Sequence, residues 1–452
     1  MSAPVAPATV MARKPGVGPA SSVGPASSKP VRARLGAPRA GTVVLALLCA
    51  MYLILYVDRV NISTAAPLIQ AELGLSNAQL GLAFSGFAYP YAFFQLFGGW
   101  LGDRFGARLV LASCGLLVGV ATMLTGAVGG LASLFLARLA LGFGEGAMFP
   151  TATHAMARWV PRQRYGFAQG ITHAFARLGN ALTPPLIAGL IALASWRASF
   201  VMLGCASLAW VAAWAWYFRD DPAAHPAMTE AELATLTPPR KAAEPAVKVP
   251  WRRLARRMLP VTAVDFCYGW TLWLFLSWVP SFFYKAYHLD LKSSALFAAG
   301  VFLAGVAGDT AGGLLSDAIL RRTGRLTAAR SGVIGLGLLG AAAFLTPLLF
   351  VRDLTVITLC LTAAFFCAEL VVAPIWAVPM DIAPRHAGTA SGMMNLGFGL
   401  AGIVSPVVFG YALDATGSWS VPFLASIALL CAGAAATLLI RPEERFEDTA
   451  QT

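Results

Sequence analysis

Residues 109–137, LVLASCGLLVGVATMLTGAVGGLASLFLA, contain no charged side chain. A bilayer core about 30 Å thick is crossed by a helix of roughly 20 apolar residues. This run is therefore long enough for one span, a glycine-rich turn at 126–130 and the start of another span. Only helices and closed barrels satisfy their backbone hydrogen bonds in lipid, and barrel strands alternate polar and apolar residues. The stretch predicts two consecutive transmembrane helices.

Uncharged runs of similar length recur along the chain, and glycine, proline and charge clusters between them mark turns. We predict an all-α membrane protein with twelve transmembrane helices in two pseudo-symmetric six-helix halves. The predicted spans are 41–66, 79–102, 108–128, 131–156, 166–193, 197–218, 258–286, 293–316, 328–350, 354–380, 388–412 and 418–440.

The composition supports a membrane protein and excludes a soluble enzyme. The 452 residues are 58% hydrophobic and only 12% charged, about half the charged fraction of a typical soluble domain. The seven cysteines are odd in number, lie in apolar runs and form no CxxC pair, so we interpret them as packing residues. We predict no metal site and no cofactor.

The net charge of +12 is explained by topology. Twelve spans place both termini on one side, and 26 of the 33 lysines and arginines fall on that side, against four on the other. The positive-inside rule then makes both termini cytoplasmic. The prediction is a multi-pass membrane protein with no nucleic-acid partner.

The chain divides into five segments. Residues 1–40, rich in Ala, Pro, Ser and Gly and without an acid, predict a disordered cytoplasmic tail, or a start placed too far upstream. There is no apolar signal-peptide core before residue 41. Residues 41–218 and 258–440 form the N- and C-terminal halves, 219–257 the cytoplasmic linker and 441–452 a cytoplasmic tail. Residues 251–258 predict a short interfacial helix entering the seventh span.

Three segments of the first half have counterparts, in the same order, in the second. GGWLGDRFGAR (98–108) resembles GGLLSDAILRR (312–322), Val160-Pro-Arg162 resembles Ala383-Pro-Arg385, and SWRASF (195–200) resembles SWSVPF (418–423). The offsets place spans one to six on spans seven to twelve. Two related halves with a substrate site between them near the midplane are typical of alternating-access transporters.

Several segments resemble the major facilitator superfamily and, within it, the anion:cation symporter family. They are YVDRVNISTAAP (56–67), FSGF (84–87), GGWLGDRFG (98–106), Arg138 with Glu145, DIAPRHAG (381–388) and GIVSP (402–406). The resemblance covers about residues 41–440. It implies proton-coupled symport, in the uptake direction, of a small organic anion such as a sugar acid, by a monomer in the bacterial inner membrane.

The Gly-Gly-x-x-x-Asp motif and its repeat predict a gate. Glycines such as Gly98 allow close helix approach, and Asp103 and Asp317 are placed to pair across the two halves on the cytoplasmic side. With Arg104 they predict a latch of the outward-open state. The alternative is that Arg104 only marks the cytoplasmic side.

Three cations remain within the predicted spans: Arg59, Arg138 and Arg177. The acids there are Asp58, Glu145 and Glu369, with Asp265 and Asp309 nearer the ends. A charge at the bilayer centre costs about 2.5–3.5 kcal/mol on insertion scales, so these groups must pair, face a cavity or function. Asp58 and Arg59 are adjacent and point about 100° apart on a helix, whereas Arg138 and Glu145 share one face.

The family resemblance suggests roles for these residues. Asp58 and Glu145 resemble the proton-coupling acids, Arg59 the ligand of the substrate carboxylate, and Arg138 a link between the acids. Tyr56, Tyr91 and Gln95 resemble residues that line the site, and Asn395 resembles a ligand of substrate hydroxyls. Trp376 is a candidate to stack on the substrate, with ordinary packing as the alternative for it and for the tyrosines.

The fifth span departs from the sugar-acid pattern. Phe175 occupies a position that is Gln in some relatives, with Arg177 two residues later and His173 before it, and Glu369 is a further addition in the tenth span. Arg177 is a candidate second cationic contact for a dicarboxylate or an aromatic acid. A plain Arg177–Glu369 ion pair, or a helix-end pair, is the alternative.

Other classes lack their motifs. The sequence contains no HExxH, GxSxG or P-loop pattern, which argues against an intramembrane enzyme and against ATP-driven transport. An efflux antiporter of a drug or metabolite is the remaining alternative. The Asp58–Arg59 and Arg138–Glu145 pairs favour anion uptake.

Overall fold

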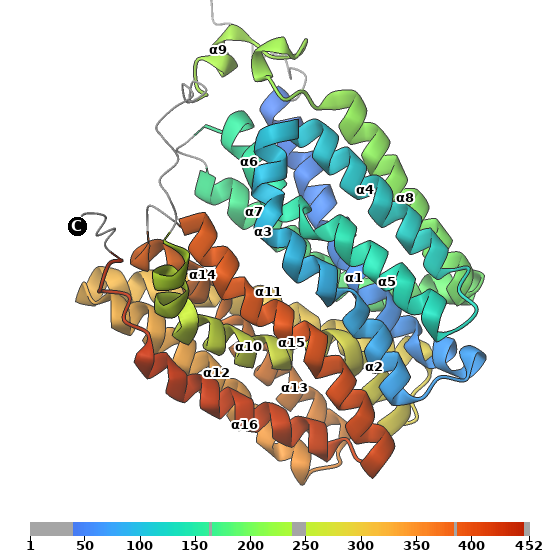
Figure 1. Ribbon diagram of the computed structural model, residues 1–452. Helices are drawn as coiled ribbons and strands as arrows, with labels where there is room; N and C mark the ends of the chain where they lie inside the picture. The colour runs from blue at the N-terminus through green and yellow to red at the C-terminus, as the bar shows by residue number, and fades with distance from the viewer. Residues whose placement is uncertain (1–38, 162–164, 237–249, 384–386, 447–452) are drawn as a thin grey trace, which may run out of the picture. The chain divides into compact units, whose positions relative to one another are not determined.

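The computed structural model describes residues 39–161, 165–236, 250–383 and 387–446, and its regular structure within them is helical (Figure 1). The helices before residue 237 are α1 (Ala40–Leu73), α2 (Asn77–Gly86), α3 (Ala88–Phe105), α4 (Ala107–Thr125), α5 (Leu131–Gly146), α6 (Met148–Trp159), α7 (Tyr165–Leu193), α8 (Trp196–Tyr217), η2 (Pro222–Ala224) and α9 (Glu230–Leu233). Those after residue 249 are α10 (Trp251–Ala286), α11 (Leu291–Thr323), η3 (Ala328–Gly332), α12 (Val333–Leu345), η4 (Thr346–Leu349), α13 (Leu354–Glu369), α14 (Val372–Ile382), α15 (Ala387–Thr416), α16 (Ser420–Ala436) and η6 (Thr437–Leu439).

Among the described residues, eleven helical segments are long and apolar enough to cross a membrane. They coincide with eleven of the twelve predicted spans, so the predicted multi-pass helical fold is confirmed. The remaining predicted span, 79–102, falls on α2 and α3, two shorter helices that are separated at Phe87.

Three predicted spans are interrupted in their middle, at Phe87 between α2 and α3, at Ala147 between α5 and α6, and at 370–371 between α13 and α14. A proline follows each interruption, namely Pro90, Pro150 and Pro374. Proline has no N–H and cannot bond the carbonyl four residues earlier, so the carbonyls of Gly86, Gly146 and Leu370 lose their helical partner. Proline alone does not decide the interruption, since α1 and α15 continue through Pro67 and Pro406.

Residues 251–258 differ from the expectation. They form the first turns of α10, which continues without a break to Ala286, and do not form a separate interfacial helix. The exposed fraction of Trp251 is 58%, so this part of α10 carries an uncovered aromatic ring.

We call the end of the helices where α1 begins and η6 stops the terminal end, and the other end the distal end. At the distal end, the Asp414 carboxylate of α15 accepts hydrogen bonds from the backbone N–H groups of Asn77 and Ala78, at 3.1 and 2.7 Å. These groups begin α2, where free N–H groups favour an anion. Lys285 of α10 donates hydrogen bonds to the side chains of Gln70 and Asn77. These contacts join the N-terminal helices to the C-terminal helices.

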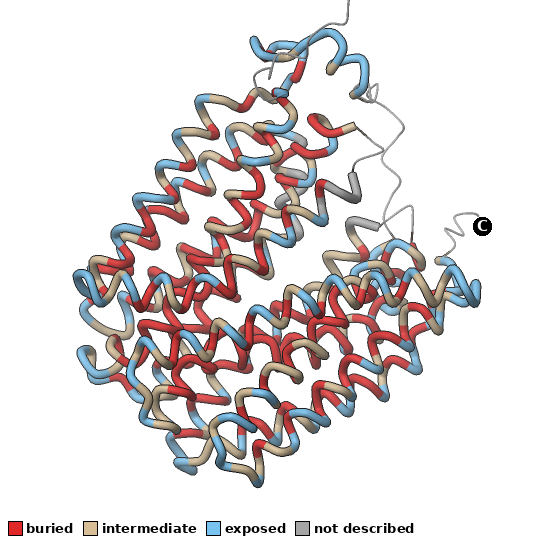
Figure 2. Tube along the Cα trace, turned by 180° about the vertical axis from the view of Figure 1, so that it is seen from behind, coloured by how far each residue is buried: buried red, intermediate tan, exposed pale blue. Residues whose placement is uncertain are grey.

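Two glycines permit the contact between α2 and α15. A Cβ atom on Gly410 would lie 2.1 Å from the carbonyl oxygen of Asn77, and one on Gly81 would lie 2.1 Å from that of Pro406. Helices in lipid associate through such close approach, because the surrounding chains are as apolar as the side chains. Figure 2 shows the buried residues concentrated where helices face one another.

We expect Gly410→Leu to destabilise the protein. The added side chain has to displace the α2 backbone, and overpacking of this kind costs about 1–3 kcal/mol. The measurement is the thermal unfolding midpoint of the purified protein in detergent. Gly300→Leu is the matched control, because a Cβ atom on Gly300 of α11 meets nothing within 4 Å. Equal midpoints for the two variants would contradict the prediction.

Candidate functional site

The centre of the site is a buried ion pair between α1 and α5. Nη2 of Arg59 lies 2.6 Å from Oε2 of Glu145, and the side chains are 2% and 0% exposed. Glu145 precedes the interruption at Ala147, where Pro150 leaves the Gly146 carbonyl without its helical bond. A charge-assisted contact of this length offsets part of the cost of burying both charges.

Aromatic rings enclose the Arg59 guanidinium. Its Cζ atom lies 4.8 Å from the ring centroids of Tyr56 and Tyr91, and 4.9 Å from that of Phe87. Phe87 sits at the interruption between α2 and α3 and also lies 5.3 Å from the Arg138 guanidinium. The ring faces attract the cation and keep it in an apolar enclosure. Glu145 and Phe87, which both lie at an interruption of a span, therefore both contact the Arg59 side chain.

Asp58 points away from Arg59, as adjacent helical residues must. Its Oδ2 accepts a hydrogen bond of 2.9 Å from the hydroxyl of Ser207 on α8. Nη1 of Arg138 lies 3.5 Å from the backbone carbonyl oxygen of Asp58, so Arg138 approaches α1 without pairing with the Asp58 carboxylate. Glu145 thus forms its ion pair with Arg59 of α1. Arg138 shares a helix face with Glu145 but contacts the Asp58 carbonyl oxygen instead.

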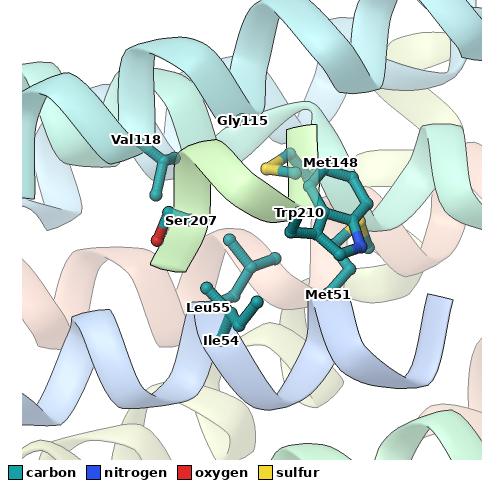
Figure 3. Close-up of a pocket in the computed structure, with 8 residues that line it drawn as sticks. All are labelled: Met51, Ile54, Leu55, Gly115, Val118, Met148, Ser207 and Trp210. Carbon is teal, nitrogen blue, oxygen red and sulfur yellow. The ribbon is translucent and has the colours of Figure 1, made fainter. Parts of the chain in front are cut away.

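Next to Ser207 is a cavity of about 10 Å³ (Figure 3), which is about the space one water requires. It is lined by Met51, Ile54, Leu55, Gly115, Val118, Met148, Ser207 and Trp210. A larger cavity of about 300 Å³ lies at the distal end, lined by residues that include Tyr287, Arg352 and Trp419. Neither lining includes Arg59 or Glu145.

Several polar atoms of the central group lack a hydrogen-bond partner within the described ranges. They include Oδ1 of Asp58, Nε of Arg59, Nε of Arg138 and Oε1 of Glu145, all buried. A buried polar atom without a partner is costly, so these atoms are candidate contacts for a ligand, a proton or a water.

A second buried ion cluster joins α7 to α11 and α13. Nη2 of Arg177 lies 3.0 Å from Oε2 of Glu369, and its Nε donates a hydrogen bond of 3.3 Å to Oδ2 of Asp309. We call Arg177, Asp309 and Glu369 the interface triad. The ion-pair alternative for Arg177 and Glu369 is therefore present in this structure, together with an acid that the sequence had placed only near a helix end.

The remaining predicted ligands differ in their surroundings. Asn395 of α15 donates a hydrogen bond to the side chain of Gln95 on α3, and both are half-buried. Trp376 of α14 is 41% exposed, unlike the buried charges of the two clusters.

The predicted gate is described only in part. The surroundings of Gly98 and of the Asp103 side chain are outside what the structure describes. Arg104 is exposed, with its guanidinium 5.7 Å from the ring of Phe105. In the second half, Arg330 binds Asp381 at 2.8 Å and lies 3.8 Å from the exposed Asp317. Asp381 belongs to the DIAPRHAG segment, so that motif and the repeated glycine motif meet at Arg330.

The sequence did not identify Phe87, Ser207 and Asp309 as parts of these clusters. The sequence does carry a signal for Phe87, because this residue ends the FSGF segment and lies three residues before Pro90. Ser207 lies in an uncharged span with no motif, and only the packing of α8 on α1 brings it to Asp58. Within the described residues, no group of three or more His, Cys, Asp or Glu side chains is arranged to hold a metal ion.

The arrangement is that of a membrane transporter. Two buried ion clusters lie between helices that are long and apolar enough to cross a membrane, and one of them, the interface triad, joins an N-terminal helix to C-terminal helices. Comparison with known proteins gives the family. The sequence model described as Major Facilitator Superfamily matches residues 48–406, so the chain belongs to that superfamily.

Two relatives refine the assignment. The "Probable sulfoacetate transporter" of Cupriavidus necator is 52% identical over 88% of this chain and 94% of its own length. The hexuronate transporter of Bacillus subtilis is 31% identical over 82% of this chain and 87% of its own. With these relatives, the chain falls in an anion-transporter family, and it is a transporter rather than an enzyme.

Solved structures support the fold. A bacterial homologue of the human lysosomal transporter Spinster has a TM-score of 0.74 and 17% identity, covering 92% of this chain and 100% of that one. A D-xylose–proton symporter has a TM-score of 0.70 and 16% identity, covering 89% and 98%.

We expect Arg59→Leu to destabilise the protein by about 3–5 kcal/mol, because the Glu145 carboxylate would remain buried without its partner. The double variant Arg59→Leu/Glu145→Leu removes both charges and should recover most of that loss. The measurement is unfolding of the purified protein in detergent. Neither variant should transport substrate, because both lack Arg59. A recovery in the double variant would therefore concern stability and not function. A double variant as unstable as Arg59→Leu would contradict this account.

Proposed function

We propose that the protein imports a small organic anion together with protons. It would sit in the bacterial inner membrane as a monomer, with both termini in the cytoplasm, and would alternate between outward-open and inward-open states. In this scheme the halves 41–218 and 258–440 move about a central site, with 219–257 as the cytoplasmic linker. The observation that carries the proposal is the buried Arg59–Glu145 pair inside its ring of aromatic side chains.

The pair provides a direct exchange between proton and substrate. Arg59 is a fixed cation that a substrate carboxylate can bind, but Glu145 occupies it at 2.6 Å. When Glu145 takes up a proton, Arg59 is released for the substrate anion, and the carboxylic acid can stay buried at a smaller cost than a lone carboxylate. Substrate and proton then enter and leave together.

Asp58 is proposed as the second proton-coupling acid. It bonds Ser207 through Oδ2, while Oδ1 is buried without a partner in the described structure. Arg138 lies beside its backbone carbonyl and shares a helix face with Glu145. Arg138 is therefore placed to respond to a charge change at either acid, as the predicted link would require.

The proton gradient supplies enough energy for this cycle. Each proton contributes about 1.4 kcal/mol per pH unit, and each net charge about 2.3 kcal/mol per 100 mV. Uptake of a monoanion is driven by the membrane potential only when more than one proton accompanies it. Two coupling acids are consistent with that requirement.

The substrate is proposed to be a small carboxylate, either a sugar acid or a two-carbon sulfonate such as sulfoacetate. The names of the relatives support both, and the 52% identity with the Cupriavidus protein favours the second. A second buried cation, Arg177, suits a substrate with two anionic groups. Tyr56 and Tyr91 would line the site, Asn395 would bind a polar group of the substrate, and Trp376 would cover it from α14.

The gate is proposed to act as predicted from the sequence. Gly98, Asp103 and Arg104 in the first half, and Asp317 in the second, would hold the cytoplasmic ends of the halves together in the outward-open state. The support is that the repeated motif of the second half already forms an ion-pair group, with Arg330 between Asp317 and Asp381.

Reconstituted protein tests the function. Proteoliposomes are given sulfoacetate, D-glucuronate and D-glucarate with a pH gradient imposed in either direction. We expect accumulation of at least one of these anions on the alkaline side, abolished by a protonophore. Accumulation on the acidic side would instead support the efflux antiporter.

Glu145→Gln should abolish accumulation driven by a pH gradient, because the amide cannot exchange a proton. It should leave counterflow, the exchange of labelled for unlabelled substrate, because Arg59 can still bind the anion. Both are measured in the same proteoliposomes, with wild-type protein as the reference. Wild-type accumulation in the variant would refute the role of Glu145.

Arg177→Ala should reduce transport of a dianion at least tenfold, about 1.4 kcal/mol, while transport of a monoanion changes little. The reason is that only the dianion has a second charge for Arg177 to bind. The measurement compares initial uptake rates of both classes in one preparation. Equal loss for both would leave Arg177 as a structural ion-pair partner only.

A further inference from the structure

We propose that the interface triad is a second exchange site, in which the second anionic group of the substrate replaces Glu369 on Arg177 while Glu369 takes up one extra proton. The inference rests on the proposed function and deepens it. It makes the number of protons carried depend on the charge of the substrate.

The charges of the triad do not balance. One guanidinium faces two carboxylates, at 3.0 and 3.3 Å, in a site where Arg177 is 9% exposed and Glu369 is fully buried. With all groups ionised the triad carries a buried net charge of −1, which is costly in a low-dielectric interior. A dianion entering beside Arg177 would worsen the imbalance unless a proton came with it.

Glu369 is the weaker held of the two acids. Neither of its carboxylate oxygens has a hydrogen-bond partner in the described structure, so the 3.0 Å approach to Arg177 is an ion pair without directed bonding. Asp309, in contrast, accepts a hydrogen bond from Nε of Arg177. An ion pair without aligned hydrogen bonds is the easier one for an incoming anion to replace.

The two acids also differ in what happens to them when displaced. The side chain of Asp309 is 19% exposed, and it keeps its hydrogen bond to Nε of Arg177 when the other acid is displaced. The side chain of Glu369 is 0% exposed and has no hydrogen bond in the described structure to replace Arg177. A lone buried carboxylate costs far more than a buried carboxylic acid, so release from Arg177 has to be accompanied by protonation of Glu369.

The surroundings of Glu369 hold the side chain in place. A Cβ atom added to Gly305 of α11 would lie 3.1 Å from Cγ of Glu369, and one added to Gly308 would lie 3.1 Å from its Cβ. Glu369 is the last residue of α13, directly before the interruption at 370–371. The bend of this span therefore presents the carboxylate to Arg177 across the boundary between the N-terminal and C-terminal helices.

Other titratable groups face the triad from several helices. They are His173 on α7, Tyr56 on α1, and Tyr268 and Asp265 on α10, which interact electrostatically with one or more members of the triad or with one another. Helix α12, which also packs on α13, carries no titratable side chain. The hydroxyl of Tyr268 is buried without a partner in the described part of the chain and is available to a bound anion.

The step conserves charge and atoms. A proton from the side on which the substrate enters forms an O–H bond with one oxygen of Glu369. The guanidinium of Arg177 exchanges the Glu369 carboxylate for the second anionic group of the substrate, and no covalent bond of the substrate changes. The proton leaves when the substrate leaves and Glu369 pairs with Arg177 again.

The test is the pH dependence of binding to the purified protein in detergent between about pH 6 and 8. The probes are sulfoacetate, a dianion, and isethionate, in which a CH2OH group replaces the carboxylate. For each proton taken up on binding, Kd rises about tenfold per pH unit. We expect wild-type protein to take up one more proton with sulfoacetate than with isethionate, so its sulfoacetate Kd rises about tenfold more steeply per pH unit.

Glu369→Gln should remove that difference while still binding sulfoacetate, because the amide resembles the protonated acid and leaves Arg177 free. Asp309→Asn is the matched comparison within the triad and should keep the difference. Should Glu369→Gln fail to fold, the wild-type comparison of the two probes still decides the matter.

Equal pH slopes for the two probes in wild-type protein would overturn the inference. So would a slope for sulfoacetate in Glu369→Gln that matches the wild-type slope, or a loss of the difference in Asp309→Asn alone. These results differ from failure of the proposed function, in which wild-type proteoliposomes accumulate no anion under a pH gradient.

Discussion

A charged side chain within a membrane-spanning helix is costly unless it is paired, faces a cavity or functions, and this constraint organises the protein. Arg59 and Glu145 satisfy it by pairing at 2.6 Å between α1 and α5, under a cover of aromatic rings. The same need makes the pair exchangeable, because any anion that replaces Glu145 on Arg59 requires Glu145 to become neutral. In the proposed function, coupling between proton and substrate follows directly from the cost of an unpaired charge in lipid.

The bends of the helices place the groups that exchange. Glu145, Glu369 and Phe87 each lie at an interruption, and each interruption is followed by a proline that removes one backbone bond. Non-helical backbone within a membrane is tolerated where protein covers it or where it lines a site. The distal end is held by other means, through Asp414 on the start of α2 and through Gly81 and Gly410, which let α2 and α15 approach closely.

The two ion clusters differ in a way that bears on the substrate. The Arg59–Glu145 pair is balanced in charge and lies within the N-terminal helices, whereas the interface triad has an excess acid and joins α7 to α11 and α13. Helix α1, which carries Arg59, packs on α7, which carries Arg177, so the two clusters lie on neighbouring helices. A substrate with two anionic groups would engage both clusters and so connect the two groups of helices.

The sequence alone determined the membrane fold, because uncharged runs of about 20 residues leave a chain few alternatives in lipid. It also determined which cations lie within the membrane-spanning segments, because all lysines and arginines except Arg59, Arg138 and Arg177 fall in predicted loops and tails or at the ends of predicted spans. Pairing was decided only by the tertiary structure. Seven residues separate Arg138 from Glu145, yet the partner of Glu145 is Arg59, whose long side chain reaches the carboxylate of α5 from α1. Ser207 and Asp309 became part of the clusters for the same reason: contacts between distant helices depend on side-chain shape and crossing geometry, which no local pattern in the sequence encodes.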